Sequence, residues 1–366
     1  MTYSHLSAAH RELRDHTEQV AVELASITGE PGRINRPLLT ALASHGLLGR
    51  LFPKTSAMDL CLIREALARH TTEAETAFAL QGLGAYPILL AGAPATVDTW
   101  LPRITAGEAA VGFALTEPDA GSDVASLALA AVRDGDSYVL TGEKVFISNA
   151  PDADVYSVFA RTSDNGSRGI TAFAVPGDAP GLSGARQHLV SPHPIGRLVF
   201  DGVRVPATSI LGEVDGGWRV AMRTLDMFRP SVGAFALGMA QAALDAAVAH
   251  TADRQAFGKP LKDFQAVSHQ LADVATRLHA ARLMVHDAAA AYDSGAERTG
   301  HLSAMAKLFA TETAQHAVDT AIQVHGARAL EVGHPLEHLY RDVRAPRIYE
   351  GASEIQREII ARSLYR

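Results

Sequence analysis

The stretch YRDVRAPRIYEGASEIQ, residues 340–356, is the most informative part of this chain. Within it, Glu350 lies between an aromatic residue and a glycine, directly before an expected helix start. Ser353 and Gln356 have the spacing of a capping box, in which side chains satisfy the first free N–H groups of a helix. A helix N-terminus also offers N–H donors and a positive dipole end to a phosphate. The stretch could therefore supply both a base and a cradle for a diphosphate.

A second stretch, GFALTEPDAGSD at residues 112–123, runs from apolar residues into hydroxyl side chains and a glycine-containing turn. With QVHG at residues 323–326 and the C-terminal stretch, it makes the chain resemble the acyl-CoA dehydrogenase family. That family carries a TEP-x-AGSD turn, a Q-x-HG motif and an RD…IYEG motif in this order. The resemblance covers about residues 77–366 and is looser before them.

Composition limits the possible functions. The net charge is −7 and the charges are scattered, which argues against nucleic acid or an anionic membrane as the main partner. Cys61 is the single cysteine, so no internal disulfide can form, and we expect a cytoplasmic protein with a buried structural thiol. We expect no signal peptide at the start of the chain. Residues 77–97 are uncharged and long enough to span a membrane, but their Gly and Pro residues favour two buried helical pieces joined by a turn.

The residue pattern predicts an α+β fold in three domains. Residues 1–110 are expected to form an N-terminal helical domain, 111–217 a central antiparallel β domain, and 218–366 a C-terminal helical bundle. Alternation and turn residues predict strands at residues 137–142, 154–159, 170–176 and 197–202. Helical periodicity predicts long helices at residues 264–292 and 302–324.

The resemblance implies a reaction, the α,β-dehydrogenation of an acyl thioester to a 2-enoyl thioester. This chemistry needs a base for the α-proton, an acceptor for the β-hydride and a pocket that polarises the carbonyl. Side chains cannot accept hydride, and no G-x-G-x-x-G motif opens a βαβ unit, so the resemblance points to FAD. It also identifies Glu350 as the base. Local sequence alone favours a capping or salt-bridging glutamate.

The resemblance further implies contacts to cofactor and substrate. The implied FAD contacts are Phe113, Leu115, Thr116, Gly121, Ser122, Phe146, Ser148, Arg254, Phe257, Gln323, Gly326, Ala352 and Glu354. The implied substrate contacts are Ser122, Asp226, Arg229 and Gly351.

Some of these residues also have a plainer interpretation. Ser122 could cap a turn, Phe146 could be a core residue, and Arg254 could be an ordinary surface charge. Asp226 and Arg229 could form a helix-surface pair at i, i+3 spacing. The chain also departs from the family pattern: Ala352, for example, stands where relatives usually have a threonine that bonds the FAD diphosphate.

The implied partners are an acyl-CoA or acyl-carrier-protein substrate and an electron acceptor such as an electron-transfer flavoprotein. Arg254, Gln323 and Gly326 match contacts to the FAD of a neighbouring subunit, so we expect a homodimer or homotetramer.

Several alternatives remain open at this stage. They are a carrier-protein-bound acyl substrate in a biosynthetic pathway, a flavin oxidase or monooxygenase on this fold, and a flavin-free binding protein. HPLEH at residues 334–338 also spells the inverted zinc-protease pattern. That chemistry needs both histidines on one regular helix, whereas Pro335 fits only a first turn, which leaves His334 at or before the cap. We therefore expect no metal site.

Overall fold

The computed structural model describes residues 5–365, and the chain divides into two compact units. The helical unit comprises Met1–Ala25, Ser56–Glu75 and Asp226–Arg366. The sheet unit comprises Ser26–Thr55 and Thr76–Leu225. The boundaries of the three predicted domains stay a prediction. The expected lack of a signal peptide rests partly on residues 1–4, which lie outside the described residues.

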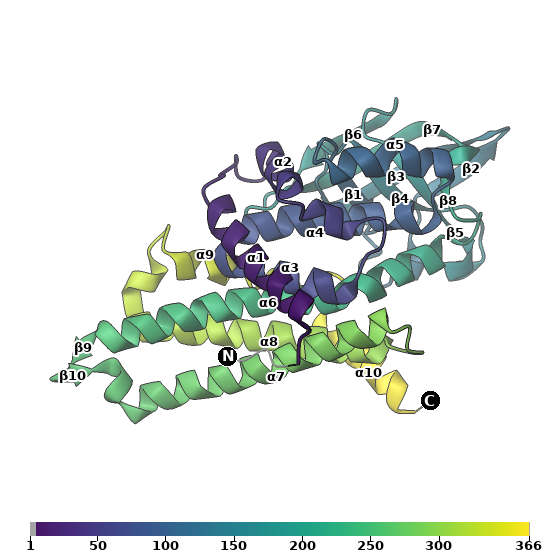
Figure 1. Cartoon of the computed structure of the whole chain (residues 1–366). Helices are drawn as coiled ribbons and strands as arrows, with labels where there is room; N and C mark the ends of the chain where they lie inside the picture. Colours follow the sequence, from purple (N-terminus) through teal and green to yellow (C-terminus); the bar gives the residue numbers. More distant parts are fainter. Residues whose placement is uncertain (1–4, 366) are drawn as a thin grey trace. The chain divides into compact units, whose positions relative to one another are not determined.

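The helical unit is built around long helices that run side by side (Figure 1). Its helices and short strands are α1 (Ala8–Leu24), α3 (Ala57–His70), the start of α4 (Thr72–Ala91), most of α6 (Gly217–Asp253), β9 (Gln255–Ala256), β10 (Lys259–Pro260), α7 (Gln265–Asp293), α8 (Gly300–His325), α9 (Pro335–Asp342) and α10 (Ser353–Leu364). The short 3-10 turns are η5 (Leu261–Asp263), η6 (Gly326–Leu330) and η7 (Ala345–Arg347). The helices predicted at residues 264–292 and 302–324 are confirmed.

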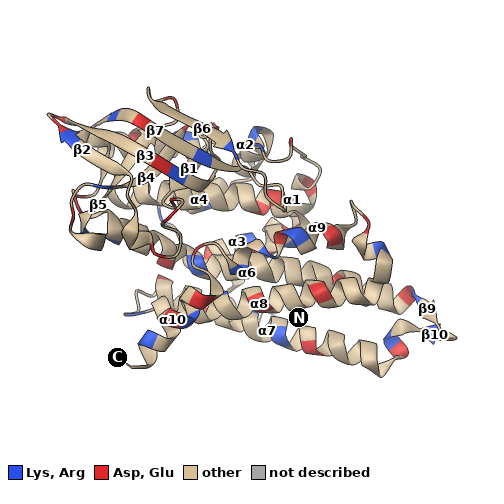
Figure 2. Ribbon diagram, turned by 180° about the vertical axis from the view of Figure 1, so that it is seen from behind, with Lys and Arg blue, Asp and Glu red and all other residues tan. Residues whose placement is uncertain are grey.

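Small residues let these helices approach closely. Ala281 and Ala288 of α7 and Ala306 and Ala310 of α8 are fully buried. A Cβ atom at Gly233 of α6 would lie 2.8 Å from Val285 of α7, so glycine is required at this contact. Along the chain, Lys and Arg are interspersed with Asp and Glu (Figure 2).

The sheet unit combines helices with an eight-stranded sheet, ordered β6-β7-β3-β2-β4-β5-β8 with β1 paired to β4. Its helices are α2 (Arg36–Ser44), the rest of α4 and α5 (Pro94–Thr105), with short turns at η1 (Leu48–Leu51), η2 (Val124–Ser126), η3 (Gly166–Gly169) and η4 (Ala207–Ser209). The strands are β1 (Val111–Ala114), β2 (Ala130–Asp134), β3 (Ser137–Ser148), β4 (Val155–Arg161), β5 (Ile170–Pro176), β6 (Leu182–Arg186), β7 (Ile195–Pro206) and β8 (Ile210–Leu211).

The predicted strands are all present, and β3 and β7 extend beyond their predicted ends. The sheet is mainly antiparallel, as predicted, and only β1 and β2 pair with β4 in parallel. A buried cluster that includes Leu140, Tyr156, Phe173 and Phe200 forms its core.

Helix α4 joins the sheet through buried polar bonds. Gln81 Nε2 donates to the Ala109 carbonyl at 2.7 Å, and Ser157 Oγ of β4 donates to the Gly84 carbonyl at 2.7 Å. α4 continues through Pro87 to Ala91, and α5 begins at Pro94. The two helical pieces predicted for residues 77–97 are present, with the turn after Ala91, but only the first is largely buried, because Pro94 and Ala95 at the start of α5 are exposed.

One described helix, α6, is long and apolar enough to cross a membrane by length and composition. Buried residues make up 67% of its most apolar window, as in the core helix of a soluble protein. The predicted buried thiol is confirmed, because Cys61 on α3 is fully buried. Burial raises the pKa of this thiol, which suits a structural role.

The predicted capping box at the start of α10 is wrong. Ala352 is the N-cap, and no side chain among the described residues caps this end. Ser353 lies inside the helix and donates through Oγ to Glu312 Oε1 at 2.8 Å. Gln356 reaches back past the helix start and donates to the carbonyls of Glu350 and Gly351. Ser353 and Gln356 therefore bond to Glu312 and to the Glu350 and Gly351 carbonyls instead of capping the helix.

Candidate active site

Glu350 lies in the short segment between η7 and α10, in the helical unit. Its backbone is left-handed, with φ of 52°, and Gly351 follows with φ of 97°. The Glu350 side chain is half-buried, and its Oε2 atom is buried without a hydrogen-bond partner among the described residues. An unpaired buried carboxylate oxygen is costly, so it indicates a place where another group binds.

Three side chains hold the main chain at this point. Arg229 Nε of α6 donates to the Glu350 carbonyl at 3.3 Å. Lys307 Nζ of α8 donates to the Gly351 carbonyl at 2.7 Å, and Gln356 Nε2 donates to the same carbonyl at 2.7 Å. Sequence reasoning gave neither Lys307 nor Gln356 a role at the site. No local signal marks them, because the contact of Lys307 joins residues far apart in the sequence and that of Gln356 replaces an expected cap.

Burial and nearby positive charges act on the Glu350 carboxyl group in opposite directions. Burial raises the pKa of Glu350 above its ordinary value. The positive charges of Arg64, Lys307 and Arg229 act in the opposite direction. Burial also lowers the pKa of Lys307 to about 8, so its ammonium is still mainly protonated at neutral pH.

Asp226 and Arg229 form the i, i+3 ion pair that the plainer interpretation expected, at 2.9 Å. Arg229 is nevertheless buried, with 7% exposure, and its bond to Glu350 links it to the candidate base. Ala352 and Glu354 lie at the start of α10, where Glu354 is exposed. Because no described side chain caps this end, its first N–H groups stay available to an anion.

In the sheet unit, the structure brings Thr116 and Phe146 together. Val145 N donates to the Thr116 carbonyl at 3.0 Å, next to Phe146 on β3. Phe146 has a φ of 55°, lies where the β3–β7 register shifts, and is 54% exposed. The plainer interpretation of Phe146 as a core residue is therefore wrong. A bulge turns this ring out of the sheet, as bulges beside functional sites commonly do.

The other predicted residues of this unit differ in how far they are exposed. Phe113 of β1 is half-buried and packs against Phe159 at 5.0 Å between ring centroids. Leu115 is buried, whereas Gly121 and Ser122 are exposed on the turn that follows. Ser148 ends β3 with its Oγ atom 3.4 Å from His193 Nε2.

A buried ion pair anchors the turn of the second stretch. Lys144 of β3 is fully buried and donates to Glu117 Oε1 at 2.7 Å and to the Leu115 carbonyl at 3.0 Å. Glu117 also accepts the N–H groups of Ala128 at 2.6 Å and Leu129 at 2.9 Å. Sequence reasoning assigned Glu117 no role beyond its place in the TEP-x-AGSD motif, because the burial of its partner Lys144 cannot be predicted from the local sequence.

Arg254, Phe257, Gln323 and Gly326 gather at the other end of α6. His250 near the end of α6 stacks on His325 at the end of α8, with ring centroids 4.1 Å apart. Arg254 and Gln323 are exposed, and Phe257 is 96% exposed. At a rise of about 1.5 Å per residue, Arg254 lies roughly 35 Å along α6 from Arg229. The structure therefore does not bring Arg254 into the Glu350 site of the same chain.

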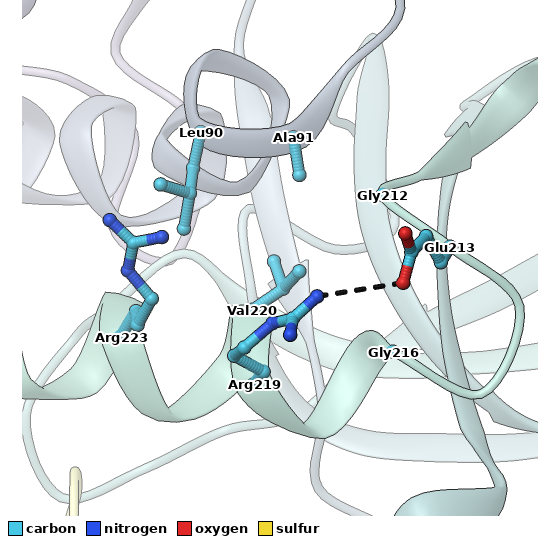
Figure 3. Close-up of a pocket in the computed structure, with 8 residues that line it drawn as sticks. All are labelled: Leu90, Ala91, Gly212, Glu213, Gly216, Arg219, Val220 and Arg223. Carbon is cyan, nitrogen blue, oxygen red and sulfur yellow. Dashed lines mark ion pairs between the residues drawn. The ribbon is translucent and has the colours of Figure 1, made fainter.

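A surface pocket of about 230 Å³ lies elsewhere in the sheet unit, between the end of α4 and the start of α6 (Figure 3). Arg219 and Arg223 project from the first turns of α6, and Arg219 pairs with Glu213 at 3.7 Å. In the part of the chain that the structure describes, none of the predicted site residues lines it.

The H-x-x-E-H pattern folds as a short capped helix. Pro335 occupies the first turn of α9 and His334 is its N-cap, as predicted. Glu337 pairs with Arg341, and His338 pairs with Asp342 at 3.0 Å. Hydrogen bonding to Asp342 raises the pKa of His338. The described residues contain no group of three or more His, Cys, Asp or Glu that could hold a metal ion.

Comparisons with known proteins agree with this architecture. The N-terminal, middle and C-terminal domains of acyl-CoA dehydrogenases match residues 7–108, 112–203 and 215–365. The cyclohexane-1-carbonyl-CoA dehydrogenase of Geobacter metallireducens is 38% identical over 362 residues, covering 95% of this chain and 93% of that protein. The caffeyl-CoA reductase–Etf complex subunit CarC of Acetobacterium woodii is 35% identical over 376 residues, covering 99% and 98%. The structure of butyryl-CoA dehydrogenase from Megasphaera elsdenii matches with a TM-score of 0.93 and 32% identity, covering 100% of both chains.

The helical and sheet units thus form the fold of a flavin-dependent oxidoreductase. The chain belongs to the acyl-CoA dehydrogenase family. The predictions of family, fold class, enzymatic nature and FAD as the cofactor are confirmed.

Proposed function

We propose that this enzyme catalyses the α,β-dehydrogenation of an acyl-CoA thioester to the 2-enoyl thioester, with Glu350 as the base. The observation that carries the proposal is the buried Oε2 atom of Glu350, which has no partner among the described residues. Burial also raises the pKa of this carboxyl. A base with a raised pKa is better matched to the weakly acidic α-proton of a thioester.

The chain's own part in the reaction is to take a proton and to hold the reacting groups. The Cα–H bond breaks, and its proton passes to Glu350 Oε2. FAD, when bound, supplies the acceptor for the β-hydrogen, which leaves with its electron pair. In the sheet unit, Phe146 and Thr116 are the residues that we propose to contact the cofactor; in the helical unit, the N–H groups at the start of α10 are the proposed donors to an anion. Their fit is supported by the exposed ring at the β3 bulge and by the uncapped helix end.

Two further features of the reaction follow as proposals. The relative from Acetobacterium woodii is named as a reductase in a complex with Etf. We therefore propose an electron-transfer flavoprotein as the electron partner. The same Glu350 in its protonated form could return the α-proton in the reverse direction. Acyl-carrier-protein thioesters remain the alternative substrate, and the cytoplasmic location stays a prediction.

Replacement of Glu350 by Gln tests the role of the base. We expect the variant to keep FAD and its thermal stability but to lose at least about a thousandfold in flavin reduction by substrate, because the proton acceptor is gone. The measurement is bleaching of the flavin absorbance with a panel of acyl-CoA and acyl-carrier thioesters.

Glu358→Gln is the matched control, because Glu358 lies on the same helix, is exposed and pairs only with Arg362 at 2.6 Å among the described residues. Flavin reduction at the parent rate in Glu350→Gln would show that another group is the base.

A further inference from the structure

Lys307 is a fully buried cation for which the proposed reaction has no use. It projects from the middle of α8, and its Nζ atom donates to the Gly351 carbonyl at 2.7 Å. Burying an ammonium group is costly unless nearby groups compensate it. Its bond to Gly351, the residue that follows Glu350, therefore calls for an explanation.

The backbone that Lys307 contacts is strained. Glu350 has a φ of 52°, in the left-handed region that costs a residue with a Cβ atom about 1–2 kcal/mol. Such a conformation persists only where the surrounding structure determines it. Here Lys307 and Gln356 both donate to the Gly351 carbonyl, and Gln356 and Arg229 both donate to the Glu350 carbonyl. Donors from α6, α8 and α10 thus fix two successive carbonyls.

The surrounding charges show which anion balances Lys307. The groups that act on Glu350 or Lys307 include Arg64 of α3, Arg229 of α6, Glu312 of α8 and Glu354 of α10, with Asp226, Glu75, Tyr349 and Arg347 next to them. Most of these are already paired. Arg64 bonds Glu75 and Ser231, Arg229 bonds Asp226, and Arg347 bonds Glu312.

Lys307 itself makes no ion pair with a carboxylate among the described residues. The anion that stabilises its charged form most strongly is Glu350, ahead of Glu312 and Glu354. By reciprocity, the ammonium of Lys307 stabilises the ionised form of Glu350.

We propose that Lys307 is a positioning residue for Glu350: it fixes the left-handed main chain beside the carboxyl group and, through its charge, favours the ionised form of that group. Gln356 shares the first task and not the second, because its amide is neutral. The proposal rests on the proposed function, in which Glu350 is the base.

Lys307→Met tests both tasks at similar side-chain volume. Loss of the positive charge raises the proton affinity of Glu350, so the acid limb of the kcat profile moves to higher pH by about one unit. On the acid side of the limb we expect kcat to fall about tenfold, with KM changed less than about twofold. In Gln356→Leu, which keeps the charge, we expect a lower kcat with an unmoved acid limb. Arg277→Met, an exposed cation on α7, is the control.

A spectroscopic readout makes the test independent of turnover. Infrared difference spectra against pH should show a protonated-carboxyl band that is absent in Glu350→Gln, and this band should titrate at higher pH in Lys307→Met. FAD content and thermal stability are measured in parallel. If Lys307→Met does not fold, Lys307→Gln, which keeps a donor for the Gly351 carbonyl but no charge, must show the same shift.

The outcomes separate the two proposals. An unmoved acid limb, band and kcat in the Lys307 variants, with Glu350→Gln inactive, would overturn the positioning role and leave the base intact. An active Glu350→Gln would overturn the proposed function instead.

Discussion

At the scale of single residues, Gly351 is required by the geometry beside the candidate base. Its φ of 97° lies in a region that disfavours residues with a side chain. A Cβ atom there would also lie 2.6 Å from Gln356 Nε2, the atom that donates to the Glu350 and Gly351 carbonyls. The glycine of the YEG motif thus makes room for the group that orients the glutamate.

Gly351→Ala should therefore impair catalysis more than stability. We expect about 1–2 kcal/mol of destabilisation from backbone strain, and at least a tenfold lower kcat because displaced Gln356 no longer holds Glu350. Gly295→Ala is the matched control, with a φ of 70° and no atom within 4 Å of the added Cβ. Thermal unfolding and flavin bleaching give the two values. Equal kcat values in both variants would contradict this account.

The same residues show what the sequence could reveal. Glu350 could be singled out because its motif is short and local. Lys307 could not, since a lysine within the predicted helix at residues 302–324 is ordinarily a solvent-facing residue, and its burial depends on which helices pack around it. Gln356 was misassigned because its spacing matches a cap, whereas a carbonyl five residues away offers a better acceptor.

At the scale of elements, strand β3 combines an anchor and a bulge. Lys144 is fully buried and pairs with Glu117 at 2.7 Å, whereas Phe146 two residues later is 54% exposed. Regular alternation would place both side chains on the same face of the strand. The register shift between Lys144 and Ile147 breaks this alternation, so the anchored turn and the exposed ring lie next to each other. Alternation predicted the start of this strand, but it could not predict the bulge that ends the pattern.

Removing one partner of the Lys144–Glu117 pair should destabilise the sheet unit. Either Lys144→Met or Glu117→Gln leaves a buried group uncompensated, which typically costs about 3–5 kcal/mol. We expect the double variant to lose less than the sum of the two single losses, by more than about 1 kcal/mol. Urea unfolding of the holoenzyme measures each loss, with the exposed Lys54→Met as control. Strict additivity would mean that the two residues act independently.

At the scale of the whole molecule, the length of α6 separates the two groups of predicted cofactor residues. Arg229 lies beside Glu350, whereas Arg254 follows the far end of the helix, roughly 35 Å away at about 1.5 Å per residue. The family resemblance assigned Arg254 to the FAD of a neighbouring subunit. The exposure of Arg254, Gln323 and Phe257 supports this assignment, which implies that a site is complete only in a homo-oligomer.

Subunit mixing tests this arrangement directly. Arg254→Ala should weaken FAD binding at least about tenfold, because a guanidinium that clamps the diphosphate is lost. If Arg254 serves the neighbouring subunit, a hybrid of Arg254→Ala and Glu350→Gln chains contains one site with both wild-type residues. With random mixing, about a quarter of the sites are then intact, so mixing two nearly inactive proteins should restore about a quarter of the parent activity. Each variant remixed with itself is the control. Failure to regain activity, with hybrids demonstrated by native mass spectrometry, would place the action of Arg254 within its own chain.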